Sequence, residues 1–333
     1  MKVCVIMDGM SAVTYHRLAM PFAMIRHFGQ LDVHFAITQP DIEKVNAKDY
    51  DAIVISRFLR YNTKLLVECK KHGTKLIVDN DDFWSIPKHN PAYKMYRKHA
   101  KDAVINAIKH ATRVITTTPQ LAEKTKELNP NVYICPNALD LEEPQWNATA
   151  AHPFTIGYVT GSSHLYDVKL LEGQMDKICT QNNTNFLLAG YAPMHPISMR
   201  MEYYITQTKT ERPTWFYIGE GVNVLNYGKY YSFMDVAIAP LEKDQFNKYK
   251  SELKIVEAAA YKLPIFVSDV DPYTNHHDNK GVIFIKDNDW SVMNEYLSNK
   301  PLLKELGQHN YDYCLKHHNL HTINETRIKA ITD

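Results

Sequence analysis

The sequence predicts an α/β protein built of two doubly wound, Rossmann-like domains that face each other across a cleft. Short apolar runs alternate with helical patterns along the chain, which is typical of βαβ units and parallel sheets. The alternation stops once, in the aperiodic stretch 136–153, and then begins again. A chain of 333 residues is long enough for two cores of ordinary size.

The apolar runs predict six strands in each half of the chain. In the first half they lie at 3–7, 33–37, 52–56, 75–79, 113–116 and 132–134. In the second half they lie at 155–159, 185–189, 214–218, 235–239, 265–268 and 282–285. We therefore place an N-terminal domain at 1–145, a C-terminal domain at 152–305 and a final helical segment at 306–333.

Helical periodicity fills the intervals between these strands. The first half predicts helices at 14–28, 63–72, 91–110 and 119–128. The second half predicts them at 164–179, 196–208, 225–231, 251–262, 290–297 and 301–318. Pro91 and Pro119 stand where two of these helices begin, a position that proline tolerates.

The composition is that of an ordinary globular protein, with 45% hydrophobic and 23% charged residues. No run of about 18 apolar residues is present, so we expect no membrane span. The first nine residues predict a strand rather than a signal peptide, which favours a cytoplasmic location. The five cysteines are scattered and mostly lie in apolar segments, which indicates free thiols in a reducing compartment.

The charge is unevenly distributed along the chain. Residues 1–150 carry a net charge of +4 and the remainder −3, and the segment 88–113 holds seven lysines and arginines against one acidic residue, Asp102. Such a segment is either a solvated helix face or a footprint for a polyanion such as DNA.

The helix at 251–262 carries the strongest functional pattern. Ser251 is its expected N-cap, and the residues that follow are almost all apolar, which predicts burial. Lys254 and Glu257 lie three residues apart on one face, and Lys250 precedes Lys254 by one turn. Lysines at a helix N-terminus attract an anion, and a carboxylate one turn deeper can bind a diol. A structural Lys254–Glu257 pair in the core is the open alternative.

A second anion-binding pattern opens the C-terminal domain. The strand at 155–159 leads into Gly161, Ser162 and Ser163, small residues whose backbone N–H groups can approach a phosphate. In a parallel sheet this loop emerges on the same edge as helix 251–262. His164 and Asp167 are expected to clamp the turn.

Two loops of the first domain offer candidates for binding a second substrate. Tyr15 and Arg17 begin the helix after the first strand, where they suit an anionic or sugar ligand, although Arg17 equally suits a surface salt bridge. Asp81 and Asp82 follow the strand at 75–79. Their spacing does not match a calcium loop, so we favour an acceptor-binding or base role over a metal site.

Other motifs of known chemistry are missing from the sequence. The loop after the first strand is not a GxGxxG dinucleotide fingerprint, and no G-x-S-x-G elbow or Walker lysine occurs. His16 and the pairs His276-His277 and His317-His318 lack zinc-binding spacing, so no zinc site is predicted.

Several of these motifs together resemble the GT-B glycosyltransferases of the glycosyl transferases group 1 type, most closely their short phage- and bacterial-encoded branch. The most specific is Lys250-Ser251-x-x-Lys254-x-x-Glu257-Ala-Ala-Ala, followed by Leu263-Pro264-Ile-Phe-Val-Ser-Asp. The supporting features cover most of the chain, at 15–18 with Pro21, 79–84, 114–118, 134–137 and 157–164 with Asp167.

The resemblance implies that the C-terminal domain binds a nucleotide sugar, usually a UDP-sugar, and that the N-terminal domain binds the acceptor. It implies a retaining reaction without a metal or another cofactor, and final helices at 306–333 that cross back to the first domain. The implied catalytic residues are Lys250, Lys254 and Arg17. The donor-binding residues are Gly161, Ser162, Ser163, Asn247, Ser251 and Glu257, with Glu257 on the ribose, and the acceptor-binding residues are Tyr15, Asp81 and Asp82.

One departure from the family pattern concerns the donor sugar. The family commonly has a second glutamate eight residues before the ribose one, and here that position is Tyr249. Asn247 or Asp244 are the candidates to replace it, and the identity of the sugar stays open.

The basic segment and the phage-like features suggest a hydroxymethylated base in phage DNA as the acceptor, which would place the reaction in the host cytoplasm. A glycan, lipid or protein acceptor is equally open. A GT-B nucleotide-sugar epimerase or hydrolase and a non-catalytic nucleotide-sugar or nucleic-acid binding module are the alternative functions. The sequence does not predict an oligomeric state.

Overall fold

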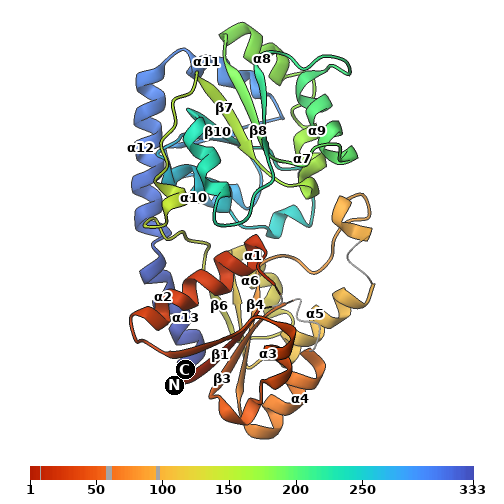
Figure 1. Cartoon of the computed structure of the whole chain (residues 1–333), viewed down its shortest axis with the longest axis vertical. Coiled ribbons are helices and arrows are strands. Elements are labelled where there is room, and N and C mark those ends of the chain that lie inside the picture. Colours follow the sequence, from red (N-terminus) through yellow and green to blue (C-terminus); the bar gives the residue numbers. More distant parts are fainter. Residues whose placement is uncertain (8, 58–61, 95–97) are drawn as a thin grey trace.

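A computed structural model describes residues 1–7, 9–57, 62–94 and 98–333. It contains two six-stranded sheets, one in each half of the chain (Figure 1). The first has the order β2-β1-β3-β4-β5-β6, with every neighbouring pair parallel. Its strands are β1 (Lys2–Ile6), β2 (Asp32–Ala36), β3 (Ala52–Ser56), β4 (Lys75–Asn80), β5 (Arg113–Thr116) and β6 (Val132–Ile134).

The second sheet is also parallel and has the order β12-β11-β10-β7-β8-β9. Its strands are β7 (Thr155–Val159), β8 (Asn185–Tyr191), β9 (Phe216–Glu220), β10 (Val236–Ala239), β11 (Ile265–Ser268) and β12 (Val282–Ile285). All twelve strands lie within two residues of the positions predicted from the apolar runs. The predicted architecture of two doubly wound sheets is confirmed.

The helices of the first half depart from the prediction in three places. The single helix expected at 91–110 is the 3-10 helix η3 (Pro91–Lys94) and the α-helix α5 (Lys98–His110), and residues 95–97 lie outside the described part of the chain. The helix expected at 14–28 is α1 (Ala12–Thr14), a π-helical turn η1 (Tyr15–Ala19) and α2 (Met20–His27). The short helix α3 (Gln39–Lys44) was not predicted, and it begins with a capping box between Thr38 and Asp41. The other helical segments are η2 (Ala47–Asp49), α4 (Asn62–His72) and α6 (Pro119–Lys126).

The helix predicted at 164–179 is interrupted. Gly173 has a φ of +70° and separates α7 (Leu165–Lys169) from α8 (Met175–Asn182). The remaining segments are η4 (Pro144–Trp146), η5 (Ser162–His164), α9 (Pro196–Thr206), η6 (Tyr227–Phe233), η7 (Asn247–Tyr249), α10 (Leu253–Ala260), η8 (Tyr273–His276), η9 (Trp290–Met293), α11 (Asn294–Leu297), α12 (Lys300–His317) and α13 (Leu320–Thr332).

The predicted N-cap of the central helix is wrong. The helix α10 begins at Leu253, with Glu252 as the N-cap residue and without a side-chain capping bond. Ser251 lies one residue too early to cap it, and its Oγ instead accepts a hydrogen bond of 2.8 Å from Asn137 Nδ2. Ser251 therefore joins the segment between the two sheets to the loop before α10.

The last two helices divide between the two halves of the molecule. Figure 1 shows α12 running along the second sheet's domain and α13 continuing to the first. Gly307 of α12 packs so closely on the α10–β11 turn that a Cβ there would lie 1.9 Å from the Lys262 carbonyl oxygen. The apolar side chains of α13, including Leu320 and Ile331, belong to the core of the first domain.

The segment 136–153 between the sheets is packed against them. Trp146 is 2% exposed, and its ring lies against Gly228, where a Cβ would be 2.8 Å from it. Cys4, Cys69, Cys135, Cys179 and Cys314 are free and buried, as predicted. Within the described part of the chain, the search for a helix with the length and apolarity of a membrane span finds none.

Candidate functional site

A cavity of about 480 Å³ opens at the carboxyl edge of the second sheet, on the side that faces the first domain. Parallel α/β sheets bind ligands at this edge. Backbone from the ends of β7, β8 and β9 forms one wall, and Met10 and Ala12 of the first domain contribute to the opposite side. Polar side chains also line the cavity, and those that carry the argument are His164, Tyr227, Lys254 and Glu257.

Glu257 is the most fully hydrogen-bonded side chain of this wall, and it is 1% exposed. Its Oε1 accepts a bond of 2.7 Å from the Tyr227 hydroxyl. Its Oε2 accepts bonds of 2.6 Å from the Tyr231 hydroxyl and 2.9 Å from Lys254 Nζ. A carboxylate offers about four acceptor positions, so one is left for a ligand in this arrangement.

Glu257 is held as a carboxylate despite its burial. Burial alone would raise its pKa, but the charge of Lys254 and the hydrogen bonds from Tyr231, Lys254 and Tyr227 lower it below its ordinary value. The side chain of Lys254 is 22% exposed, so it is the partner that can turn toward a ligand in the cavity. The predicted Lys254–Glu257 pair is therefore present, and it lies on a cavity wall rather than in a closed core.

A hydrogen-bond chain connects Glu257 with the first domain. Because the Tyr227 hydroxyl donates to Glu257, its oxygen accepts from His16, whose Nε2 lies 2.7 Å away. His16 Nδ1 then has a lone pair, and it is without a partner among the residues the structure describes. Burial lowers the pKa of His16 to about 4, against the opposing effect of Glu257. A neutral His16 thus links the two domains at the cavity.

The π-helical turn η1 determines where His16 and its neighbours lie. Such turns are frequent at functional sites. Tyr15, His16 and Arg17 of this turn have partners in three different places: Glu143, Tyr227 and Asp79. The sequence predicts Tyr15 and Arg17 as site residues, whereas the structure brings His16 to Tyr227 on the cavity wall.

Gly161 lines the cavity, while Ser162 and Ser163 lie in the turn beside it. Among the residues that the structure describes, none has an atom within 4 Å of a Cβ placed at Gly161, so the backbone there is open to a ligand. His164 follows, and its Nδ1–H donates to Asp167 Oδ2 at 2.7 Å, as the predicted clamp requires. Burial and the charge of Lys250 lower the pKa of His164 despite Asp167, and Nε2 is left as an acceptor.

Lys250 lies in the loop between η7 and α10, where its ammonium is 5.4 Å from the centre of the Phe246 ring. Its charge acts on His164 and Asp167 of the second domain and on Asp82 of the first. Lys250 therefore sits between the two domains, but it is not one of the residues that line the cavity.

Asp81 and Asp82 form the first domain's side of this region. Arg57 binds both, with Nε 3.0 Å from Asp81 Oδ1 and Nη2 3.1 Å from Asp82 Oδ2. Burial, opposed by Arg57, raises the pKa of Asp82 to about 6. The charge of Lys250 also acts on Asp82 and, like Arg57, opposes this rise.

Arg17, predicted to be catalytic, is placed in the core of the first domain. It is 2% exposed and binds Asp79 with two bonds of 2.9 Å. Its Nη1 donates to the Cys135 carbonyl and to Asn137 Oδ1. These contacts give Arg17 a structural role and place it outside the residues that line the cavity.

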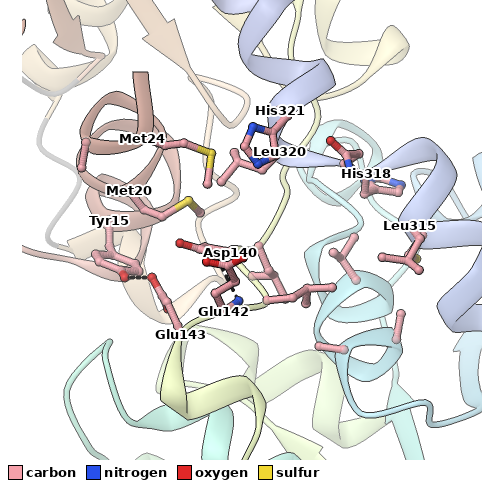
Figure 2. Close-up of a pocket in the computed structure, with 18 of the residues that line it drawn as sticks. Tyr15, Met20, Met24, Asp140, Glu142, Glu143, Leu315, His318, Leu320 and His321 are labelled. Atoms are coloured by element: carbon pink, nitrogen blue, oxygen red, sulfur yellow. Dashed lines mark hydrogen bonds between the residues drawn. The ribbon is translucent and has the colours of Figure 1, made fainter. Parts of the chain in front are cut away.

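Tyr15 lines a different cavity from Glu257. Its hydroxyl donates to Glu143, and both residues belong to a hinge cavity of about 670 Å³ formed by α2, the segment 139–143, α10, α12 and the start of α13 (Figure 2). Of the predicted acceptor-binding residues, Tyr15 therefore lines the hinge cavity, whereas Asp81 and Asp82 line neither of these two cavities.

Asn247 and the proposed replacements for the missing glutamate have internal partners. Asn247 donates from Nδ2 to Asp167 and to the Glu242 carbonyl, and its backbone N–H donates to Asp244. The ring of Tyr249, which occupies the position of the family's glutamate, packs 4.8 Å from the ring of Phe83 in the first domain. His164, rather than Asn247 or Asp244, lines the cavity.

The basic segment 88–113 lies on the first domain, with exposed Lys88, Lys101 and Lys109. Its helix α5 buries Val104, Ala107 and Ile108 against the sheet, while Lys101 and Lys109 stay exposed. Arg97 and the side chains of Lys94 and Lys98 lie outside the described residues.

No protein-family model and no curated protein sequence matches the chain. Its structure is similar to a sucrose-phosphate synthase from Thermosynechococcus elongatus, at 12% identity and a TM-score of 0.71 over 98% of this chain and 97% of that one. A UDP-forming α,α-trehalose-phosphate synthase from Burkholderia xenovorans matches at 10% identity and a TM-score of 0.67, over 100% and 99%. A candidate UDP-N-acetylglucosamine 2-epimerase from Listeria monocytogenes matches at 9% identity and a TM-score of 0.57, over 93% and 91%.

These similarities extend over nearly the whole of each chain. Together with the two parallel sheets and the cavity between the domains, they define the fold as GT-B, the fold predicted from the sequence. At such low identity they show the fold alone.

Proposed function

We propose that this protein is a retaining glycosyltransferase that moves a sugar from a UDP-sugar to a hydroxyl acceptor. The observation that carries the proposal is the cavity wall on which Gly161, Lys254 and Glu257 meet at the carboxyl edge of the second sheet. This wall combines open backbone, a cation and a carboxylate. A nucleoside diphosphate requires these three groups for its phosphates and its ribose.

Donor binding in this proposal includes an exchange of partners. Glu257 has one acceptor position to spare, whereas a ribose presents two hydroxyls. Lys254 leaves Glu257 Oε2 for the diphosphate, which frees that oxygen for the second hydroxyl. Gly161, with the turn of Ser162 and Ser163, accommodates the phosphates, and His164 Nε2 accepts from a hydroxyl of the donor sugar.

The transfer step needs positive charge more than it needs a protein base. Cleavage of the sugar–phosphate bond places negative charge on the β-phosphate, and fixed cations stabilise that charge. Lys254 and Lys250 supply it, so we propose a metal-independent transfer. In a retaining reaction the acceptor hydroxyl attacks on the face that the diphosphate leaves, and its proton passes to a phosphate oxygen.

The acceptor enters from the first domain, on the side of Asp81 and Asp82. The exposed lysines of the segment 88–113 favour DNA, with a hydroxymethylated base, flipped out of the stack, supplying the hydroxyl. A phage or bacterial source of the protein is part of this proposal. Glycans, lipids and proteins are the alternative acceptors. The epimerase-like neighbour supports a second candidate, a nucleotide-sugar epimerase or hydrolase.

The experiment that tests the proposal is a panel of UDP- and GDP-sugars incubated with the protein, with and without hydroxymethylated DNA. Nucleotide release that depends on the DNA supports the transferase and its acceptor. Release without any acceptor identifies an epimerase or hydrolase. Tight UDP binding without release on any acceptor identifies a binding module and overturns the proposal.

A further inference from the structure

Three buried side chains with metal-ligating atoms meet where the two domains join. Glu252 immediately precedes α10, His276 ends η8, and His318 lies between α12 and α13. They are 5%, 2% and 8% exposed, respectively. One ligand atom from each lies within 4.8 Å of the other two. None of the three is adjacent in sequence, so the spacing of the histidines did not reveal the cluster.

Two of the three side chains of the cluster have polar atoms without a hydrogen-bond partner among the described residues. Within the described ranges, Glu252 Oε2 and His276 Nδ1 are buried without a hydrogen-bond partner. His276 Nε2 lies 4.0 Å from Glu252 Oε1, which is too long for a hydrogen bond. A buried carboxylate oxygen without a partner costs on the order of 1–3 kcal/mol, so this arrangement calls for a positive ligand.

His318 is already oriented as a metal ligand. Its Nδ1 lies 2.9 Å from the Asn137 carbonyl oxygen, and since a carbonyl only accepts, Nδ1 carries the proton. The lone pair is then on Nε2. A backbone carbonyl on the other ring nitrogen is the usual support of a metal-bound histidine.

The donor set indicates the class of metal. Two imidazoles and one carboxylate suit Zn²⁺ and its first-row neighbours and are poor ligands for Ca²⁺ or Mg²⁺. Zinc bonds of about 2.0–2.2 Å require the three donors to draw together by about an ångström. Cys314 precedes His318 by four residues, but its Sγ lies outside the group of atoms within 4.8 Å and donates to Asn310 Oδ1 at 3.7 Å. It becomes a fourth ligand only if its side chain turns away from Asn310.

The hinge cavity supplies an entry path. His318 and Cys314 line it, and Figure 2 shows Asp140, Glu142 and Glu143 around the same space. Three carboxylates at its rim raise the local concentration of cations. A metal ion can therefore reach His318 from solvent without opening the cavity that holds Lys254 and Glu257.

We propose that Glu252, His276 and His318 form a binding site for a divalent transition-metal ion, with Zn²⁺ as the first candidate. The bound ion fastens the start of α10, which carries Lys254 and Glu257, to the turn where α12 passes into α13. The site is separate from the proposed transfer chemistry, and metal binding is measurable without any transferase activity.

The test is metal titration of the chelator-treated protein. One equivalent of Zn²⁺ is expected to bind and raise the melting temperature, and one equivalent of Co²⁺ to give the visible absorption of a tetrahedral site. His276→Gln and His318→Gln each remove a ligand and are expected to weaken binding at least roughly tenfold. Their exposed neighbours provide matched controls, His277→Gln and His317→Gln, which retain it.

Glu252→Gln, which keeps the shape of the side chain, tests the site if a histidine variant fails to fold. It is expected to weaken Zn²⁺ binding by a similar factor. Cys314→Ser distinguishes three protein ligands from four, because it removes sulfur-to-cobalt absorption only if the thiolate binds. Failure of the wild-type protein to bind one equivalent, or binding that survives Glu252→Gln and both ligand histidine variants, overturns the proposal.

Discussion

Lys254 and Glu257 share an ion pair of 2.9 Å in which the carboxylate side chain is 1% exposed and the lysine 22%. The carboxylate is fixed by two tyrosine hydroxyls, whereas the lysine is held by the carboxylate and reaches the cavity. A ligand phosphate can therefore recruit the lysine without disturbing the tyrosines. In the proposed donor site, this asymmetry lets the pair rearrange through one side chain.

Replacement of Glu257 by glutamine is the first prediction. Glu257→Gln keeps the size of the side chain but removes the charge and one acceptor, so UDP affinity should fall by at least about tenfold, or about 1.4 kcal/mol. Isothermal titration calorimetry with UDP measures the change. Glu220→Gln, on an exposed residue at the end of β9, is the control. Equal UDP affinities for Glu257→Gln and wild type would remove Glu257 from the ribose site.

Removal of the lysine charges is expected to act on turnover. Lys250→Ala and Lys254→Met should each lower kcat by on the order of a hundredfold if they stabilise the leaving diphosphate. Lys248→Ala is a matched control, because Lys248 lies two residues earlier, in η7, and is exposed. Single-turnover measurements separate this effect from donor binding. A rate unchanged in Lys250→Ala would restrict the leaving-group role to Lys254.

The twelve strands and the Lys254–Glu257 pair were predictable because each depends on local sequence. Buried parallel strands form continuous apolar runs, and residues three apart on a helix meet whatever surrounds them. The π-helical turn was not predictable, because it arises from the packing of Tyr15, His16 and Arg17 against three different partners. The placement of Arg17 in the core depends on Asp79, 62 residues away.

The part of the site that sequence reasoning missed is tertiary in origin. Tyr227 lies in a helical segment without a recognisable motif, and it reaches Glu257 only through the fold. The sequence predicts a structural role for His164, because its pairing with Asp167 is local. Its position on the cavity wall follows from the end of β7. The sequence predicts where β7 ends, but not which side chains line the cavity.

Acid pH should destabilise the protein through His16. Its pKa is about 4 in the folded state and about 6.5 in an unfolded chain. Below pH 6.5 the unfolded state therefore takes up a proton that the folded state refuses until about pH 4, and stability falls across that range. The loss attributable to His16 is about 3 kcal/mol.

Chemical denaturation at several pH values measures this effect. His16→Gln, which does not titrate, should show a smaller decline between pH 6.5 and pH 4 than wild type. Its stability near pH 8 reports separately the loss of the bond to Tyr227. Parallel declines in the two proteins would show that His16 is accessible to protons in the folded state.

Protonation of Asp82 should lower the rate of the transfer reaction at acid pH. Burial raises its pKa to about 6, so below that pH it gains a proton and no longer accepts a hydrogen bond from an acceptor hydroxyl. We expect kcat/KM for the acceptor to fall below about pH 6 in wild type. In Asp82→Asn the rate should be lower throughout and its acid limb absent. If kcat/KM still declines below about pH 6 in Asp82→Asn, another group causes the decline.

DNA binding should depend on the exposed face of α5. Lys101→Glu with Lys109→Glu reverses two exposed charges of α5 and leaves the buried Val104 and Ile108 in place, so the fold should be retained. Affinity for DNA should fall, and the slope of log K against log salt should become shallower by about 0.9 for each phosphate that the protein no longer neutralises. Fluorescence anisotropy at several salt concentrations measures both, with Lys177→Glu and Lys304→Glu on the second domain as an equally charged control. If both double variants bind alike, the basic segment is a solvated face and the acceptor is to be sought among glycans, lipids and proteins.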